Sequence, residues 1–371
     1  MTRESNGSWR SSCERLDREL AGGRFGDAQY LSDNTAILYQ GLRETIAVHI
    51  SIPLPSLRSD LPYAIQVILR RTLDEAFAAL VDGGLELATA KVKRFFEYGD
   101  VDGVRYRCAR HDSSNLAILT DWTDDPFSEA IARAFVDSMG GEGLDIRIVA
   151  PRRDQIEMVA ESVAAINSIL PLTGPSTLGL VRGIALMEGA VPSAYINENP
   201  LTFLVNVDRF SDTLLLAETI FHEALHQKLV DIRLTSYLLT EGYDDKESEG
   251  RGDVSVPWPR IEMPRKWSSA RALAAFHVYS HLVVLYATVL CRCDHEPVFG
   301  VLPDVIACRL EVSYERARYL ALALARPICQ SHFSVDGREL FGLLVRCLDA
   351  LAGFPIRDGT LQQVATRWCV A

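Results

Sequence analysis

The spacing of apolar residues along the chain predicts a mixed fold whose second half is mainly helical. Apolar positions recur every three or four residues in eight segments, at 62–80, 86–98, 127–139, 154–170, 211–229, 270–291, 314–330 and 338–352, with a further helix expected over 360–369. This period is typical of α-helices packed on one face. Short runs rich in β-branched residues predict strands at 45–54, 104–108, 116–119, 144–149, 179–187 and 202–207. The expected fold class is therefore α+β, predominantly α-helical in the C-terminal half, with the buried helix over 211–229 packed against the helix over 270–291.

The length of the chain, 371 residues, suits one large domain or two ordinary ones. The change of pattern near residue 170 predicts a mixed α/β N-terminal region over 1–170, to which we assign substrate binding. The mainly helical region over 171–371 would then hold the metal and the catalytic residues. The alternative is one continuous domain.

The net charge of −11 argues against a polyanionic partner. The sequence also has no cluster of Lys and Arg with interleaved aromatic residues that would bind a polyanion despite the negative net charge. We therefore expect no nucleic acid among the partners.

Hydropathy indicates a cytoplasmic protein with no membrane partner. The N-terminal segment, MTRESNGSWRSSCERLDREL, lacks the apolar core of a secretory signal. The most apolar stretch, residues 272–291, is interrupted by His277, Tyr279, Ser280 and His281. Such a segment is better suited to a buried helix than to a membrane span.

The segment FHEALHQKL, residues 221–229, carries the pattern that points most directly to chemistry. Residues four apart share a face of a helix, so His222 and His226 can offer two imidazoles to one metal ion. Glu223 stands where it can act as the catalytic acid or base beside that ion. Glu218, one turn earlier, could orient His222 by a hydrogen bond. The competing interpretation is a buried helix whose histidines bond to the backbone or to each other.

The third metal ligand would decide the chemistry, and the residues leave three alternatives. A metzincin needs Gly and His three and six residues after the second histidine, but Leu229 and Ile232 stand there. Glu241 could serve as in a gluzincin, although it follows His226 more closely than is usual for that class. His277 and His281, four apart on the next apolar helix, are the other candidates. We favour His277 as the ligand over His281 and Glu241.

The region from about residue 210 to residue 285 resembles the HExxH-motif peptide-modification proteins of peptide natural-product clusters. The matching segments are HEALHQKL at 222–229, VPWPR at 256–260, the Pro-Arg pair at 264–265 and AFHVYSHL at 275–282. The resemblance implies an iron(II)/2-oxoglutarate-dependent β-hydroxylase acting in natural-product biosynthesis. Its substrate would be an amino acid or peptide, free or attached to a carrier or a leader.

An oxygenase of this kind needs an arginine to pair with the distal carboxylate of 2-oxoglutarate. Arg260, Arg265 and Arg271 lie between the polar loop and the second histidine pair, and we favour the first two. The iron would be bound by His222, His226 and His277.

Two other functions remain open from the sequence. One is a zinc-dependent metallopeptidase or other hydrolase with Glu223 as general base. The other is a non-catalytic helical protein that binds a partner. The nature of the metal separates the two enzymatic functions.

Overall fold

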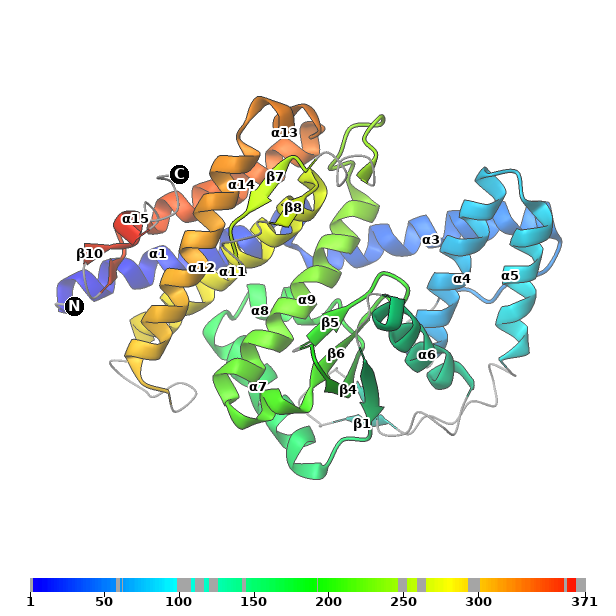
Figure 1. Ribbon diagram of the computed structural model, residues 1–371, viewed down its shortest axis with the longest axis horizontal. Coiled ribbons are helices and arrows are strands. Elements are labelled where there is room, and N and C mark those ends of the chain that lie inside the picture. The colour runs from blue at the N-terminus through cyan, green and yellow to red at the C-terminus, as the bar shows by residue number, and fades with distance from the viewer. Residues whose placement is uncertain are drawn as a thin grey trace. The chain divides into compact units, whose positions relative to one another are not determined.

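The computed structural model describes residues 3–57, 61, 63–98, 108–110, 117–119, 126–141, 145–191, 193–245, 252–258, 265–292, 301–356 and 359–364 (Figure 1). Packing divides the chain into two interleaved compact units. Unit 1 comprises Met1–Asp27, Asn167–Pro175 and Ile232–Ala371, and unit 2 comprises Ala28–Ile166 and Ser176–Asp231. The assignment of substrate binding to residues 1–170 and of catalysis to residues 171–371 stays a prediction. The boundaries between the two compact units do not divide the chain at residue 170.

Unit 2 is built on a six-stranded mixed sheet. Its strands are β1 Cys108–Arg110, β2 Ala117–Leu119, β3 Ile146–Val149, β4 Gly183–Gly189, β5 Ser193–Tyr195 and β6 Thr202–Asn206. The order is β1-β2-β4-β6-β5, with β3 also paired to β4. Strands β2, β4 and β6 run parallel, whereas β5 pairs antiparallel with β6 at the end of that order. Both β4 and β6 are largely buried, as expected for central strands.

The helices of unit 2 precede, interrupt and follow this sheet. They are α3 Ala28–Ile50, α4 Tyr63–Val81, α5 Leu85–Glu97, α6 Pro126–Gly141, α7 Arg153–Ile169, α8 Thr173–Leu178, the 3-10 turn η1 Val207–Ser211 and α9 Thr213–Thr235. The last residues of α7 and α9 and the first residues of α8 belong to unit 1. Figure 1 shows α9 running beside β5.

One predicted strand, over 45–54, is wrong. Residues up to Ile50 belong to α3, whose buried positions Leu31, Thr35, Tyr39 and Ile46 have helical spacing. This face packs against α4 and, to a smaller extent, α5. The β-branched residues at the C-terminal end of α3 were mistaken for a strand because the tertiary partner of the helix is not visible in the sequence.

Unit 1 is almost entirely helical. It contains α1 Arg3–Ala21, α2 Gly23–Gly26, α11 Ser269–Arg292, α12 Pro303–Leu324, α13 Pro327–Ser331, α14 Val335–Leu351 and α15 Leu361–Val364. Two short hairpins accompany them, β7 Val254–Val256 with β8 Arg265–Trp267 and β9 Pro355–Ile356 with β10 Gly359–Thr360. The helix expected over 314–330 is divided between α12 and α13, because Pro327 cannot continue the hydrogen-bond ladder of α12.

Helix α11 is the centre of unit 1 and packs against α12, α1 and α14. The hydroxyl of Ser268 accepts the Arg271 N–H at 3.1 Å and so caps the N-terminus of this helix. By length and composition α11 could cross a membrane, but 78% of its most apolar window is buried in the structure. This burial is consistent with a soluble protein.

The described chain is thus a mixed α+β protein dominated by helices, with a helical C-terminal half, as expected. The two histidine-bearing helices, α9 and α11, fall mainly in different units. Their packing against each other stays a prediction.

Candidate metal centre

The two histidines of the HExxH motif converge on one point. His222 and His226 lie one turn apart on α9, and their Nε2 atoms are 3.2 Å apart. Two nitrogen ligands about 2.1 Å from one ion, at tetrahedral or octahedral angles, lie roughly 3.0–3.4 Å apart. Both rings are half-buried, and their planes are inclined by 64°. The pair therefore has the geometry of two ligands to one metal ion.

The environment keeps both imidazoles neutral, which is the form that ligates metals. Burial, together with the neighbouring His226, lowers the pKa of His222 to about 3. Burial lowers the pKa of His226 to about 4. Protons therefore do not compete for these two nitrogens near neutral pH.

Glu223 is buried beside the pair, with only 4% of its surface exposed. The hydroxyl of Ser193 on β5 donates a hydrogen bond to its Oε1 at 2.5 Å. Burial raises the pKa of Glu223 to about 7, and the Ser193 hydrogen bond opposes this shift only in part. A carboxyl group with a pKa near 7 can both give and take a proton at physiological pH.

Strand β5 contributes a second residue to the same face of α9. Tyr195, two residues after Ser193, stacks on the ring of His226 with centroids 6.3 Å apart and planes 21° apart. Its hydroxyl donates to Oε1 of Gln227 at 3.2 Å. Since side chains i and i+2 of a strand share a face, β5 holds both Ser193 and Tyr195 against the motif.

Polar contacts continue from the motif into the interior of unit 2. Gln227 accepts the Leu201 N–H at 2.5 Å and donates to Asp231 at 3.0 Å. Asp231 accepts a charge-assisted hydrogen bond from Arg70 at 3.2 Å, and both side chains are almost completely buried. These contacts fix the C-terminal half of the motif helix to β5, β6 and α4.

Lys228 is a fully buried cation on the same helix. Its Nζ donates to the Ser176 hydroxyl at 3.0 Å and to the Thr177 hydroxyl at 3.5 Å. These contacts join α9 to α8 at the level of the motif. Burial of an ammonium group is costly, and these hydroxyl contacts offset part of the cost.

The other histidine pair is on α11 in unit 1. His277 and His281 are both buried, with ring centroids 4.4 Å apart. Nδ1 of His281 lies 2.8 Å from the backbone carbonyl of His277. A carbonyl only accepts, so Nδ1 of His281 carries a hydrogen, and in the neutral imidazole Nε2 is then the unprotonated nitrogen. His281 thus has the tautomer of a metal ligand, although the sequence favoured His277.

The remaining predicted residues lie in varied surroundings. Glu218 is half-buried on α9, one turn before His222, and Glu241 is exposed in a turn of unit 1. Arg271 is exposed at the start of α11, with its guanidinium 5.5 Å from the centre of the Trp267 ring. The backbone of Arg265 belongs to β8, and Arg260 lies outside the described residues.

Within the described ranges, no three His, Cys, Asp or Glu side chains form a group close enough to hold a metal ion. The structure thus brings His222 and His226 together, holds the neighbouring Glu223 on Ser193 of β5, and leaves the third ligand a prediction. Sequence reasoning missed Ser193, Tyr195 and Gln227. The first two lie about thirty residues before the motif, where no local signal marks them.

Comparison with known proteins does not assign the chain to a family. No protein-family profile matches the chain, and no curated protein is significantly similar to it. The resemblance to the HExxH-motif peptide-modification proteins therefore stays a prediction.

Proposed function

We propose that this protein is an iron(II)/2-oxoglutarate-dependent oxygenase that hydroxylates an amino acid or peptide in natural-product biosynthesis. The observation that supports a metal centre is the convergence of His222 and His226, whose Nε2 atoms are 3.2 Å apart. The choice of an oxygenase rests on the sequence, which extends the resemblance from the motif to residues 256–282. The cytoplasm is the proposed location.

The residues of the chain have separate roles in this proposal. His222 and His226 would hold the ion, with a third ligand for which His277 and His281 are the candidates. Iron(II) held there would activate dioxygen, the oxidant for a C–H bond of the substrate, with 2-oxoglutarate as the co-substrate that supplies two electrons. Arg260, Arg265 or Arg271 would pair with the distal carboxylate of 2-oxoglutarate. Ser193 holds Glu223 in one orientation, and the carboxyl group of Glu223 would act near the bound ion without being a ligand to it.

The test is anaerobic addition of iron(II) and then 2-oxoglutarate to the metal-free protein, followed by visible spectroscopy. We expect a weak charge-transfer band that needs both additions and that is lost in His222→Ala and His226→Ala. His49→Ala is the matched control, since His49 is an exposed histidine at the end of α3 in the same unit. It should keep the band. Absence of the band from the unmodified protein would refute the oxygenase.

A zinc hydrolase is the second candidate, and the environment of Glu223 favours it. A buried carboxyl group with a pKa of about 7, oriented by Ser193, suits a general base that accepts a proton from water. Zinc bound by the histidine pair would lower the pKa of that water. This candidate predicts tight zinc in the purified protein, no dependence on oxygen or 2-oxoglutarate, and peptide cleavage that Glu223→Gln abolishes.

The metal titration also tests the non-catalytic alternative. If His222 and His226 only hydrogen-bond to each other, neither iron(II) nor zinc will bind at micromolar concentration, and His222→Ala will not change the affinity for either ion.

A further inference from the structure

A charged pocket in unit 2 is separate from the metal pair. It has a volume of about 400 Å³, within the range of small-molecule sites. The faces of α4, α5 and α6 line it, together with Glu198 from the connection between β5 and β6. None of its lining residues belongs to α9 or β5.

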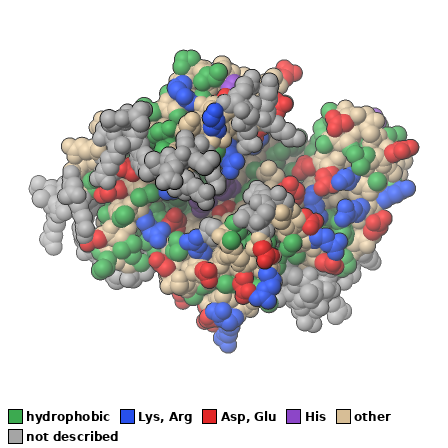
Figure 2. All heavy atoms as spheres, viewed as in Figure 1, with side chains coloured by type: hydrophobic (Ala, Val, Ile, Leu, Met, Phe, Trp, Pro, Cys, Tyr) green, Lys and Arg blue, Asp and Glu red, His purple; other side chains and the backbone are tan. Residues whose placement is uncertain are grey.

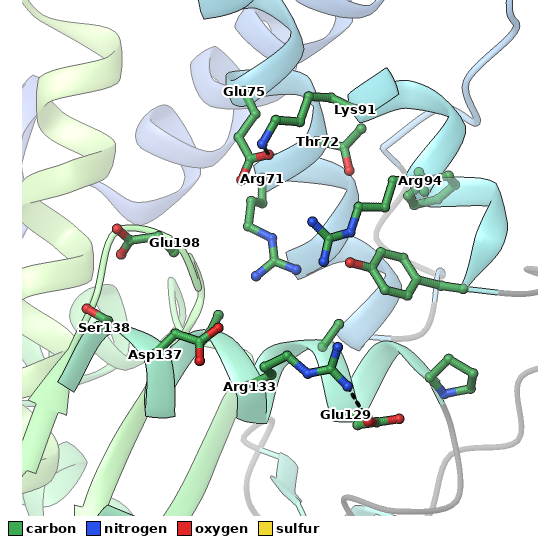
Figure 3. Close-up of a pocket in the computed structure, with 15 residues that line it drawn as sticks. Arg71, Thr72, Glu75, Lys91, Arg94, Glu129, Arg133, Asp137, Ser138 and Glu198 are labelled. Carbon is green, nitrogen blue, oxygen red and sulfur yellow. Dashed lines mark hydrogen bonds and ion pairs between the residues drawn. The ribbon is translucent and has the colours of Figure 1, made fainter. Parts of the chain in front are cut away.

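The pocket carries equal numbers of acidic and basic side chains, but half of them already have partners. Glu75 pairs with Lys91 at 2.7 Å, and Glu129 pairs with Arg133 along α6 at 2.5 Å. Figure 3 shows the second pair at the edge of the space. These two pairs cancel their own charges and are poor ligands for a further ion.

Two guanidinium groups remain on the wall made by α4 and α5. Arg71 and Arg94 both point into the space between the helices (Figure 3). Burial lowers the pKa of Arg71, Tyr98 and Glu75 oppose this shift, and the like charge of Arg94 adds a smaller contribution in the lowering direction. Arg71 also has a long hydrogen bond to Asn199 at 3.5 Å, while Arg94 has no hydrogen bond or ion pair with any described residue. An anion between the two groups would relieve their repulsion.

Two carboxylates remain on the opposite wall. Asp137 on α6 and Glu198 lie across the space from Arg71 (Figure 3). Within the described part of the chain, neither makes an ion pair or a hydrogen bond. A phosphate chain or another polyanion would meet these carboxylates and be repelled, whereas a cationic group would be attracted.

The surface of the pocket is not purely polar. Phe95 and Tyr98 belong to the lining, and both rings pack against Phe127, at 5.8 Å and 5.6 Å between centroids. Phe95 is fully buried, so this packing leaves the partly exposed ring of Tyr98 as the aromatic surface beside the arginines. An apolar side chain of a ligand could lie on it.

We propose that this pocket binds a zwitterionic amino acid or short peptide, with its carboxylate on Arg71 and Arg94 and its ammonium group near Asp137 and Glu198. The planar guanidinium forks suit a carboxylate bidentately. The separation of charge across the pocket selects a ligand with both signs over one with a single sign. The pocket thus gives unit 2 a peptide- or amino-acid-binding site in addition to the metal pair.

The test uses four probes on the full-length, metal-free protein: leucyl-leucine, its N-acetylated form, its C-terminal amide, and free leucine. Titration is followed by ligand-observed NMR. Leucyl-leucine or free leucine should bind saturably in the millimolar range or tighter, and each capped dipeptide should bind roughly tenfold more weakly than leucyl-leucine. Preference for leucine over leucyl-leucine would identify an amino-acid site, and the reverse a peptide site.

Variants connect the binding to the pocket. Arg94→Gln and Asp137→Asn change exposed side chains, and each should weaken zwitterion binding about tenfold or more. Arg152→Gln is the matched control, since Arg152 is paired with Asp154 outside the pocket. It should leave binding unchanged.

The proposal fails if neither zwitterion binds below about 10 mM. It also fails if the capped dipeptides bind as tightly as leucyl-leucine, or if Arg94→Gln binds like Arg152→Gln. Because no metal is present, these outcomes do not depend on the proposed oxygenase activity.

Discussion

Single side chains in unit 2 show how a charged residue can be kept inside a protein. Asp231 and Arg70 are each less than a tenth exposed and are joined by one hydrogen bond at 3.2 Å. Asp231 also accepts from Gln227 of the motif helix. A buried ion pair contributes little net stability, but loss of one partner is expensive because the other charge stays buried.

Asp231→Ala should therefore destabilise the protein by about 3 to 5 kcal/mol. Urea unfolding followed by circular dichroism measures the change. Asp154→Ala, in the exposed pair with Arg152, should cost far less, because solvent screens that pair. Equal costs for the two variants would show that the buried pair is not held as described.

The tautomer of His281 leads to a prediction about the third ligand. Because its Nδ1–H donates to the His277 carbonyl, its Nε2 can coordinate an ion. We expect His281→Gln to lower metal affinity at least about tenfold, and His277→Gln to lower it less. Competition with a chromophoric chelator gives both affinities. A larger loss of metal affinity in His277→Gln than in His281→Gln would identify His277 as the third ligand, as the sequence favoured.

Among the elements, β5 and α9 together form the described part of the candidate metal centre. The periodicity of α9 could be read from the sequence, since apolar residues surround His222 and His226 over the whole helix. Strand β5, three residues long, could not, because it is too short to show an alternating pattern. Its place in the sheet, antiparallel to β6, brings Ser193 and Tyr195 to the motif.

Strand β4 illustrates a close approach that only glycine permits. A Cβ atom on Gly183 would lie 2.4 Å from Cζ of the buried Tyr63 ring at the start of α4. Tyr63 also accepts a hydrogen bond from Thr202 on β6 at 3.2 Å, so the ring cannot move without cost.

We expect Gly183→Ala to lower the free energy of unfolding by roughly 1 to 3 kcal/mol, measured by chemical denaturation. Gly41→Ala is the matched control, since a Cβ there meets nothing within 4 Å in the exposed middle of α3. It should raise stability by up to about 1 kcal/mol through helix propensity. A neutral Gly183→Ala would mean that Tyr63 is displaced easily.

For the whole molecule, acidic and basic side chains are interspersed on the face seen in Figure 2. The expectation from the net charge that no polyanion is the main partner stays a prediction. The dependence of the free energy of unfolding on pH reflects all of the buried titratable groups together.

The contribution of His222 and His226 to the stability of the metal-free protein should fall as the pH is lowered from about 6.5 to about 4.5. Unfolded histidines take up protons near pH 6.5, whereas the pKa values of His222 and His226 are lowered to about 3 and about 4 by burial. Each contributes a loss of up to about 1.4 kcal/mol per pH unit. Glu223 acts in the opposite direction, because its pKa is raised to about 7 and the folded state binds its proton first. Asp74, whose pKa burial raises to about 6, and Asp231, whose pKa burial also raises, act in the same direction as Glu223, so the loss expected here is that of the two histidines alone.

Urea unfolding at several pH values measures this dependence. The double variant His222→Gln, His226→Gln should lose less stability on acidification than the unmodified protein. His49→Gln should not change the slope, because His49 is exposed. An unchanged slope in the double variant would mean that these two histidines take up protons equally in the folded and unfolded states.

The sequence by itself determined the helix-dominated α+β class, the positions of most helices, and the grouping of His222, Glu223 and His226. These follow from local periodicity, because a helix places residues four apart on one face wherever it packs. The tertiary structure decided that β5 covers the motif, that Arg70 meets Asp231 across 161 positions of chain, and that three helices enclose a charged pocket. Such contacts depend on how the elements pack, which no short sequence pattern specifies.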